Sequence, residues 1–276
     1  MADGSLQDKV AWVTGSSRGI GRVVASHLAS LGARVAVHGT SPHSTRAFDE
    51  AESLEAVARA IAAEHGVETL AVWGDLSDAA TVHNLAQEIR ACFGRIDVLV
   101  NCAGGDIGAQ GVGGPNAGKP IANDPLGVSL EDIRAVLDRN LMTCILVCRE
   151  VAPEMMARRS GWIVNVGSIA GLAGGPHEAI YRTAKAAVHQ YSRCLAGFLR
   201  PYNVHVNVVA PGTILTRRIM ASRPIDQTRK VEGGTLERYG WPLEVARAVA
   251  FLVSDESSYV SGQVLRVDGG EQLWPA

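Results

Sequence analysis

Residues 10–21 read VAWVTGSSRGIG, a short run of β-forming residues that passes directly into a glycine-rich turn. Residues 22–31 then carry apolar side chains at the spacing of one helix face, and a second β-rich run covers residues 34–37. A strand, a glycine-rich turn, a helix and a second strand in this order are typical of a βαβ unit that binds a dinucleotide.

The glycines of this turn have separate physical roles in such a unit. One makes the tight turn, one lets a pyrophosphate approach the backbone N–H groups at the start of the helix, and one permits close packing. Here the spacing is G-x-x-x-G-x-G, and with Thr14 and Ile20 it reads T-G-x-x-x-G-I-G. This form resembles the short-chain dehydrogenase/reductase family, and the resemblance continues in order over residues 9–270.

The resemblance, together with the alternation of strands and helices, implies one α/β domain. We predict a Rossmann-type doubly wound sheet of about seven parallel strands with helices on both faces. No boundary, repeat or low-complexity segment divides the chain, so residues 1–276 are expected to form a single dinucleotide-binding and catalytic domain. Further strands are predicted over residues 70–73, 96–100, 162–166, 204–209 and 261–270, and helices over 78–93, 131–158, 178–199 and 242–253.

Composition argues against several other classes of protein. The chain has 276 residues, 47% of them hydrophobic, and a formal net charge of −2 without a long block of one sign. We therefore expect no nucleic-acid partner and no membrane association. The N-terminus lacks a basic region followed by an apolar core, which predicts no secretory signal and a cytoplasmic protein.

Five cysteines, an odd number, lie in apolar or helical surroundings and are expected to be free thiols. Neither they nor the eight histidines show the spacing of metal ligands, so no metal site is predicted.

The stretch Ser168 to Lys185, SIAGLAGGPHEAIYRTAK, carries the predicted chemistry. Tyr181 and Lys185 are four positions apart and share one helix face, while Ser168 follows the buried strand 162–166. A hydroxyl, a phenol and an ammonium can thus converge on one substrate oxygen. A hydrolase is disfavoured, because Val166 occupies the position of the first glycine in G-x-S-x-G.

The family resemblance adds Asn140, at a matching distance before Ser168, as a fourth catalytic residue. It implies that Tyr181 is the general acid/base, that Ser168 binds the reacting oxygen and that Asn140 holds a water that contacts Lys185. The ammonium of Lys185 is expected to lower the pKa of Tyr181 by up to about 3 units, before burial opposes that change.

The same resemblance places the cofactor along the carboxyl ends of the strands. No acidic residue ends the second strand, where Gly39 takes the position of an NAD-selecting Asp, and Thr40, Ser41 and Arg18 suit a 2′-phosphate. We therefore favour NADP(H) over NAD(H). The predicted cofactor-binding residues are Gly15, Ser17, Arg18, Gly19, Ile20, Gly21, Gly39, Thr40, Ser41, Asp75, Leu76, Asn101, Ala103, Gly104, Tyr181, Lys185, Pro211, Gly212, Ile214 and Thr216.

Two segments beside the expected site are predicted to contact substrate. Residues 104–128 are a long loop rich in Gly, Pro and Asn that we interpret as a substrate-side flap. Residues 213–235 resemble the family's substrate lid, and the basic residues at 217–230 indicate either a solvated lid surface, which we favour, or a site for an anionic substrate.

These patterns predict an oxidoreductase that transfers a hydride between a nicotinamide cofactor and a small-molecule secondary alcohol or ketone. Sugars or polyols compete as substrates with 3-oxoacyl thioesters, as in a 3-oxoacyl-(acyl-carrier-protein) reductase. The alternative of a non-catalytic nucleotide sensor is disfavoured by the intact Asn-Ser-Tyr-Lys set. Family helices corresponding to 131–158 and 178–199 pack across subunits, so a homo-oligomer, a dimer or tetramer, is expected.

Overall fold

Seven parallel strands form one sheet, as the sequence predicts, and their order is β3-β2-β1-β4-β5-β6-β7. The computed structural model describes residues 5–274, so residues 1–4 and 275–276 of the predicted domain lie outside the described residues. The strands are β1 (Val10–Thr14), β2 (Arg34–Gly39), β3 (Thr69–Trp73), β4 (Val98–Asn101), β5 (Gly161–Val166), β6 (Val204–Pro211) and β7 (Val264–Val267).

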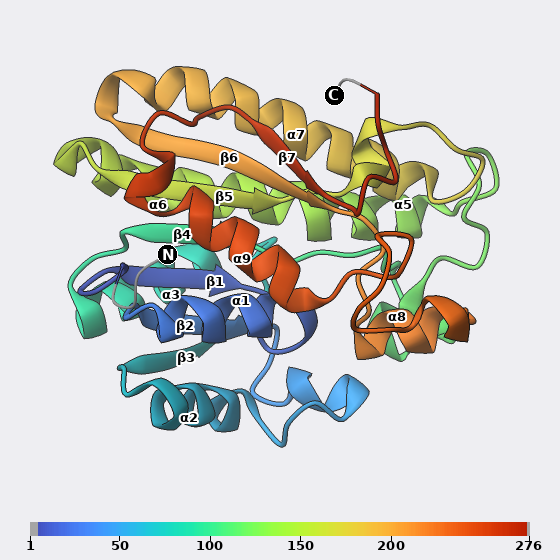
Figure 1. Cartoon of the computed structure of the whole chain (residues 1–276), viewed down its shortest axis with the longest axis horizontal. Helices are drawn as coiled ribbons and strands as arrows, with labels where there is room; N and C mark the ends of the chain where they lie inside the picture. The colour runs from blue at the N-terminus through green and yellow to red at the C-terminus, as the bar shows by residue number, and fades with distance from the viewer. Residues whose placement is uncertain (1–4, 275–276) are drawn as a thin grey trace.

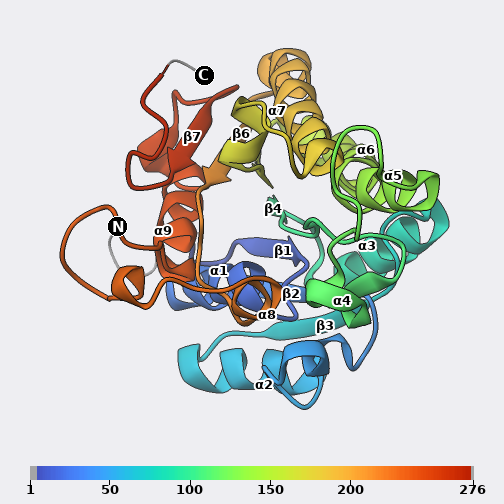
Figure 2. The ribbon, with the colours of Figure 1, turned by 90° about the vertical axis from the view of Figure 1, so that its right-hand side faces the viewer.

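Helices cover both faces of this sheet, which lies between them in Figures 1 and 2. In β1, Val10 and Trp12 pack toward one face, while Ala11 and Val13 pack toward the other. This alternation explains why the strand is a continuous apolar run, since parallel sheets are buried on both sides. On one face lie α1 (Gly19–Ser30), α2 (Leu54–His65) and α9 (Pro242–Leu252), and on the other α3 (Ala79–Phe93), α6 (Thr143–Arg158) and α7 (Ala179–Leu199).

The strand order reverses at β1, which pairs with β2 on one side and β4 on the other. In an open α/β sheet, ligands bind in the crevice outside the carboxyl ends of the strands at such a switch point. The glycine-rich turn after β1 and residues 102–105 after β4 both open into this crevice. The predicted fold class is confirmed, and it places the predicted site at this edge of the sheet.

The structure divides the predicted helix 131–158 into three parts. Helix α5 (Leu130–Leu137) passes into a π-helical turn over Asp138–Met142, and α6 follows. The turn contains Asn140, whose side chain donates to Val136 O at 2.8 Å and also bonds to the backbone after β4. Because the bond to the backbone after β4 lies outside the helix, the spacing of the apolar residues does not predict the irregular turn.

Two predicted loops contain short ordered elements. The segment 104–128 includes a 3₁₀ turn (Gly111–Gly113) and the short α4 (Pro115–Gly118), in which Asn116 and Ala117 have positive φ angles of 50° and 53°. Val57, Ile61 and the alanines around them predict a helix that follows the polar residues 42–56. In the structure this polar segment forms a 3₁₀ turn (Ser44–Phe48), and α2 begins earlier, at Leu54. Ser53 accounts for the earlier start, since its hydroxyl accepts from Ala56 N at 3.1 Å as an N-cap.

Across residues 5–274, none of the helices combines the length and the apolar character that crossing a membrane requires. The same part of the chain has no group of three or more His, Cys, Asp or Glu side chains arranged to hold a metal ion.

Candidate active site

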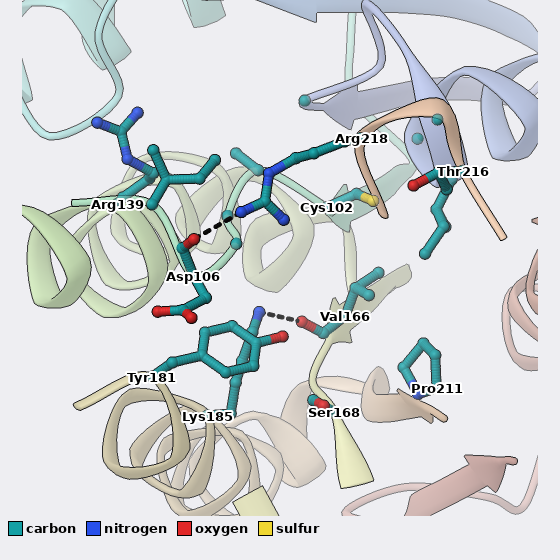
Figure 3. Close-up of a pocket in the computed structure, with 18 of the residues that line it drawn as sticks. Cys102, Asp106, Arg139, Val166, Ser168, Tyr181, Lys185, Pro211, Thr216 and Arg218 are labelled. Carbon is teal, nitrogen blue, oxygen red and sulfur yellow. Dashed lines mark hydrogen bonds between the residues drawn. The ribbon is translucent and has the colours of Figure 1, made fainter. Parts of the chain in front are cut away.

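Tyr181, Lys185 and Ser168 meet in a cleft at the carboxyl edge of the sheet, as predicted (Figure 3). Tyr181 and Lys185 lie one turn apart near the start of α7, and Ser168 follows β5. The Ser168 hydroxyl accepts from Ala170 N at 3.1 Å, which fixes its side chain at the end of the strand. The whole cleft encloses about 850 Å³, enough for a dinucleotide and a small substrate.

The Lys185 ammonium lies deep in the cleft floor, where the residue is only 5% exposed. Its Nζ donates to Val166 O at 2.8 Å and lies 5.7 Å from the centre of the Tyr181 ring. Burial lowers the pKa of Lys185 to about 8, because a buried ammonium loses hydration that one backbone carbonyl replaces only in part.

The pKa of Tyr181 is shifted in the direction opposite to the one that we expected from the charge of Lys185. Removal from water raises the pKa of its phenol to about 12, and the Ser168 hydroxyl opposes this rise as a hydrogen-bond partner. In this structure Lys185 Nζ is bonded to the Val166 carbonyl, not to the phenol, which is why its charge does not dominate. Tyr181 is therefore protonated at neutral pH and suited to donate a proton.

Asn140 lies behind the cleft wall and is 1% exposed. Its Nδ2 donates to Gly105 O at 2.9 Å, and its Oδ1 accepts from Gly105 N at 2.9 Å. These bonds hold the chain just after β4 in position, and a Cβ on Gly104 would stand 2.6 Å from Asn140 Oδ1 and 3.3 Å from Lys185 Nζ. The side-chain amide thus orients the backbone beside Lys185, and the water-mediated role expected for Asn140 stays a prediction.

The three glycines of the turn after β1 differ in conformation and in the space around them. Gly15 has φ +63° and lies so close to the next strand that a Cβ would be 2.7 Å from Ala103 Cα. Gly21 faces the carbonyl of Gly15, where a Cβ does not fit. Gly19, with φ +56°, opens to the cleft, and a Cβ there would meet only Thr216.

Small residues and a buried hydroxyl bring β4 close to the same turn. Thr14 Oγ1 accepts from Cys102 N at 3.0 Å and from Ala103 N at 3.1 Å. Asn101 instead faces away from the cleft and donates to Asn165 Oδ1 at 2.8 Å. Its position supports the sheet, and Asn101 does not line the cleft in which we predict the cofactor.

At the expected adenosine end, Gly39 and Thr40 line the cleft and Ser41 does not. A Cβ on Gly39 would collide with the Ser44 hydroxyl, so the 3₁₀ turn fills the place of an acidic side chain. Arg18 donates to Ser44 O at 2.7 Å and lies over the Phe48 ring at 5.4 Å.

Two cleft residues that sequence reasoning missed are His38 and Glu50. His38 Nδ1 accepts from Gly15 N at 3.1 Å, and its Nε2 lies 3.1 Å from Gly74 O, so the imidazole joins two strand ends. Burial lowers the pKa of His38 to about 4 and keeps it neutral. Glu50 Oε2 accepts from Gly19 N at 2.8 Å at the first turn of α1. Neither residue belongs to a spacing motif, so no sequence signal singled them out.

The remaining predicted cofactor residues come together around this cleft. Asp75 accepts from Ser77 N at 2.9 Å, which orders the turn after β3. The predicted residues that line the cleft are Gly15, Ser17, Arg18, Gly19, Ile20, Gly21, Gly39, Thr40, Asp75, Leu76, Ala103, Gly104, Ser168, Tyr181, Lys185, Pro211, Gly212, Ile214 and Thr216.

Residues 104–128 and 213–235, the predicted flap and lid, meet at one end of the cleft. The lid contains α8 (Arg217–Ser222), which contacts α4 of the flap. Figure 2 shows α8 and α4 side by side in front of the strand ends. Glu178, at the start of α7, pairs with Lys119 of the flap, and its backbone N–H donates to Asn123 O at 2.8 Å. The flap is thereby attached to the helix that carries Tyr181.

Comparisons with known proteins agree with this geometry. A family model described as enoyl-(acyl carrier protein) reductase matches residues 15–272. The chain is 39% identical over 271 residues to cyclohexanol dehydrogenase of Rhodococcus sp. strain TK6, covering 96% of each protein. It is 38% identical over 268 residues to the 3-oxoacyl-[acyl-carrier-protein] reductase FabG of Aquifex aeolicus, covering 96% of this chain and 98% of that protein.

Among solved structures, levodione reductase superimposes with a TM-score of 0.79 at 28% identity, over 96% of this chain and 98% of that one. The fold, the matching family model and these relatives lead to one conclusion: the chain belongs to the short-chain dehydrogenase/reductase family of oxidoreductases.

Proposed function

We propose that this protein interconverts a secondary alcohol and a ketone with a nicotinamide cofactor, using Tyr181 as the proton donor and acceptor. The observation that carries the proposal is the meeting of Tyr181, Lys185 and Ser168 in one cleft with the glycine-rich turn. A nucleotide-binding protein without chemistry has no need of a buried ammonium beside a phenol, so this set disfavours a sensor.

The residues of the cleft fit a dinucleotide. The bond from Gly19 N to the Glu50 carboxylate supports this fit, because it places a negatively charged group on a backbone N–H at the first turn of α1, where a phosphate can bind. The residues after β4, β5 and β6 would hold the nicotinamide half beside Tyr181. When bound, the cofactor supplies or accepts the hydride.

Tyr181 moves the proton in this proposal. In reduction, its protonated phenol donates to the carbonyl oxygen, and in oxidation its phenolate removes the alcohol proton. Ser168 hydrogen-bonds the same oxygen, where negative charge develops. The Lys185 ammonium lies close enough to stabilise a phenolate, because an opposite charge favours the ionised form.

NADP(H) remains our preferred cofactor. Gly39, Thr40 and Arg18 support this proposal, since none is acidic and Arg18 is a cation at the same end of the cleft. Against this preference, the Glu50 carboxylate lies near enough to Arg18 to offset part of its positive charge, and it would repel an additional phosphate.

The relatives support two substrate classes. FabG relatives favour a 3-oxoacyl thioester, and cyclohexanol dehydrogenase favours a small alcohol or ketone. The contact between α4 and α8 over the cleft favours the small substrate, because a long acyl chain needs an open entrance.

We further propose that residues 1–276 act as one domain, with residues 104–128 as flap and 213–235 as lid, in a cytoplasmic homo-oligomer. Free cysteines fit a reducing compartment. Exposed apolar side chains on the helical layer that we expect at the subunit contact, Leu130 and Phe198, support oligomer formation.

The proposed function is tested with a panel of ketones, secondary alcohols, sugars, polyols and 3-oxoacyl thioesters. Absorbance of the reduced nicotinamide follows turnover with NADPH and NADH. We expect turnover of at least one small ketone with NADPH at a higher kcat/KM than with NADH. Binding of neither cofactor would overturn the proposal.

A further inference from the structure

Arg218 of the lid lines the cleft, whereas Arg217 beside it does not. Arg217, the first residue of α8, is exposed and donates to Asp49 O at 2.6 Å outside the cleft. Arg218 is half-buried and lines the cleft. In Figure 3 its guanidinium extends toward the side on which Tyr181 and Lys185 lie.

The guanidinium of Arg218 has incomplete hydrogen bonding. One terminal nitrogen donates to the backbone oxygen of Asp106 at 2.5 Å, while its buried Nε has no partner. Within residues 5–274 it forms no ion pair with a carboxylate. Burial lowers the pKa of Arg218, yet an arginine stays protonated in proteins, so its charge persists inside the cleft.

The carboxylates nearby bond to other groups, although Asp106 Oδ1 has no hydrogen-bond partner among the described residues. Asp106 Oδ2 accepts from Asn123 Nδ2 at 2.7 Å and lies 3.8 Å from Lys119 Nζ. Glu178 pairs with the same Lys119. Asp106 and Glu178 therefore compensate Arg218 only at longer range.

Two other arginines at this end of the cleft form no ion pair at contact distance in the described part of the chain, although Glu178 is near enough to interact with both. Arg182 donates to the backbone oxygens of His177 and Ala173, at 2.9 and 3.1 Å. Arg223 donates to the Thr213 hydroxyl at 3.2 Å. The substrate end thus contains more positive than negative charge, and a partly buried cation without a counter-ion is costly unless a ligand supplies one.

We propose that the substrate carries a carboxylate, and that Arg218 binds it while Tyr181 acts on the carbonyl or alcohol. This inference rests on the proposed function and specifies its substrate class as oxo acids and hydroxy acids. A planar guanidinium with free N–H groups is suited to a carboxylate, which it binds through paired hydrogen bonds. Tyr181 and Arg218 are close enough to influence each other's ionisation, as two groups that contact one small molecule must be.

The test compares oxo acids with their uncharged methyl esters. Pyruvate, acetoacetate and levulinate present the carboxylate at increasing distances from the ketone, and each ester keeps the shape without the charge. With NADPH, wild-type enzyme should favour the acid of at least one pair in kcat/KM by about tenfold or more. In Arg218→Gln this preference should fall to about threefold or less, through a higher KM for the acid and an unchanged KM for the ester.

Arg217→Gln is the matched control, because it removes the same charge from the same helix outside the cleft, and it should keep the preference. Arg218→Lys retains the charge and should keep part of the preference, which separates charge recognition from a folding defect. Equal use of acids and esters by wild-type enzyme would overturn the proposal. So would weaker NADPH binding in Arg218→Gln with the preference unchanged, since the bound anion would then be a cofactor phosphate.

Turnover of neither acid nor ester by enzyme that binds NADPH would count against the proposed reaction for these compounds. The Arg218 site is then tested by calorimetric titration of the three acids into the enzyme–NADP⁺ complex. Binding by wild-type enzyme and Arg217→Gln, but not by Arg218→Gln, supports the carboxylate site. No binding of any acid to wild-type enzyme contradicts it.

Discussion

At the scale of single residues, burial shifts the pKa of Lys185 and that of Tyr181 in opposite directions. The pKa of Lys185 falls to about 8 and the pKa of Tyr181 rises to about 12, because the charged form of each side chain loses hydration in the cleft. Around neutral pH both side chains are therefore protonated. This is the ionisation state that carbonyl reduction requires.

A pH profile follows from these two values. As pH rises through about 8, Lys185 loses its proton, while Tyr181 keeps its own until about 12. We expect kcat/KM for reduction to be constant near neutrality and to fall above about pH 8, measured with NADPH and a turned-over ketone. A profile that stays constant beyond about pH 9.5 would show that the Lys185 charge is not needed.

Glu50 provides a prediction on cofactor choice. Its carboxylate is bonded to Gly19 N in the cleft, so an added phosphate nearby is repelled. Glu50→Gln should tighten NADP(H) binding by about threefold to tenfold and NAD(H) binding less, measured by calorimetry. Glu52→Gln, a change at an exposed glutamate outside the cleft, is the control. Weaker binding of both cofactors in Glu50→Gln would instead identify Glu50 as a cofactor ligand.

His38 stabilises the folded protein through its hydrogen bond to the glycine-rich turn. Its folded pKa of about 4 is below the ordinary 6.5, so His38 contributes stability above about pH 6.5 that is lost as pH falls toward 4. His38→Ala leaves Gly15 N without its acceptor and should cost about 1–3 kcal/mol in the free energy of unfolding at neutral pH. Urea denaturation measures this loss, and His43→Ala, at an exposed position, should change it little. If the free energy of unfolding of His38→Ala equalled that of the wild type, His38 would not stabilise the fold in this way.

At the scale of elements, the π-helical turn between α5 and α6 and the end of β4 act as one unit. The Asn140 side chain forms two hydrogen bonds with the backbone of Gly105. At Gly104 the backbone passes close to the side chains of Asn140 and Lys185. An extra atom at Gly104 would therefore displace the side chains of Asn140 and Lys185, and it would meet them before it met Tyr181.

Gly104→Ala tests this unit. The new Cβ would stand 2.6 Å from Asn140 Oδ1, so the Asn140 amide or the strand end must shift. We expect kcat to fall by about tenfold or more while the protein stays folded by circular dichroism. Gly113→Ala, where a Cβ meets nothing within 4 Å, is the control in the same segment. Full activity of Gly104→Ala would mean that this contact does not position Lys185.

The sequence predicted regular elements well and irregular ones poorly. β1 has the predicted bounds because its buried run and the following glycine both mark it. The π-helical turn depends on bonds from Asn140 to a strand distant in sequence, which no local periodicity contains. The N-cap Ser53 accounts for the start of α2, which the spacing of the apolar residues does not mark.

At the scale of the whole molecule, one sheet with two helical layers brings together residues from nearly every strand end. The motif residues Tyr181, Lys185 and Ser168 could be assigned to this cleft from spacing alone, since a parallel sheet places its carboxyl ends at one edge. Glu50 and Arg218 could not, because they reach the cleft from a turn and a lid whose course depends on tertiary contacts.

The central claim is that Tyr181 moves the proton, and it is tested most directly with Tyr181→Phe. The variant keeps the ring and removes only the hydroxyl, so we predict unchanged NADPH affinity by calorimetry. Loss of a general acid should lower kcat by about 10²–10⁴-fold with the substrate that wild-type enzyme reduces. Turnover at the wild-type rate by correctly folded Tyr181→Phe would contradict the mechanism.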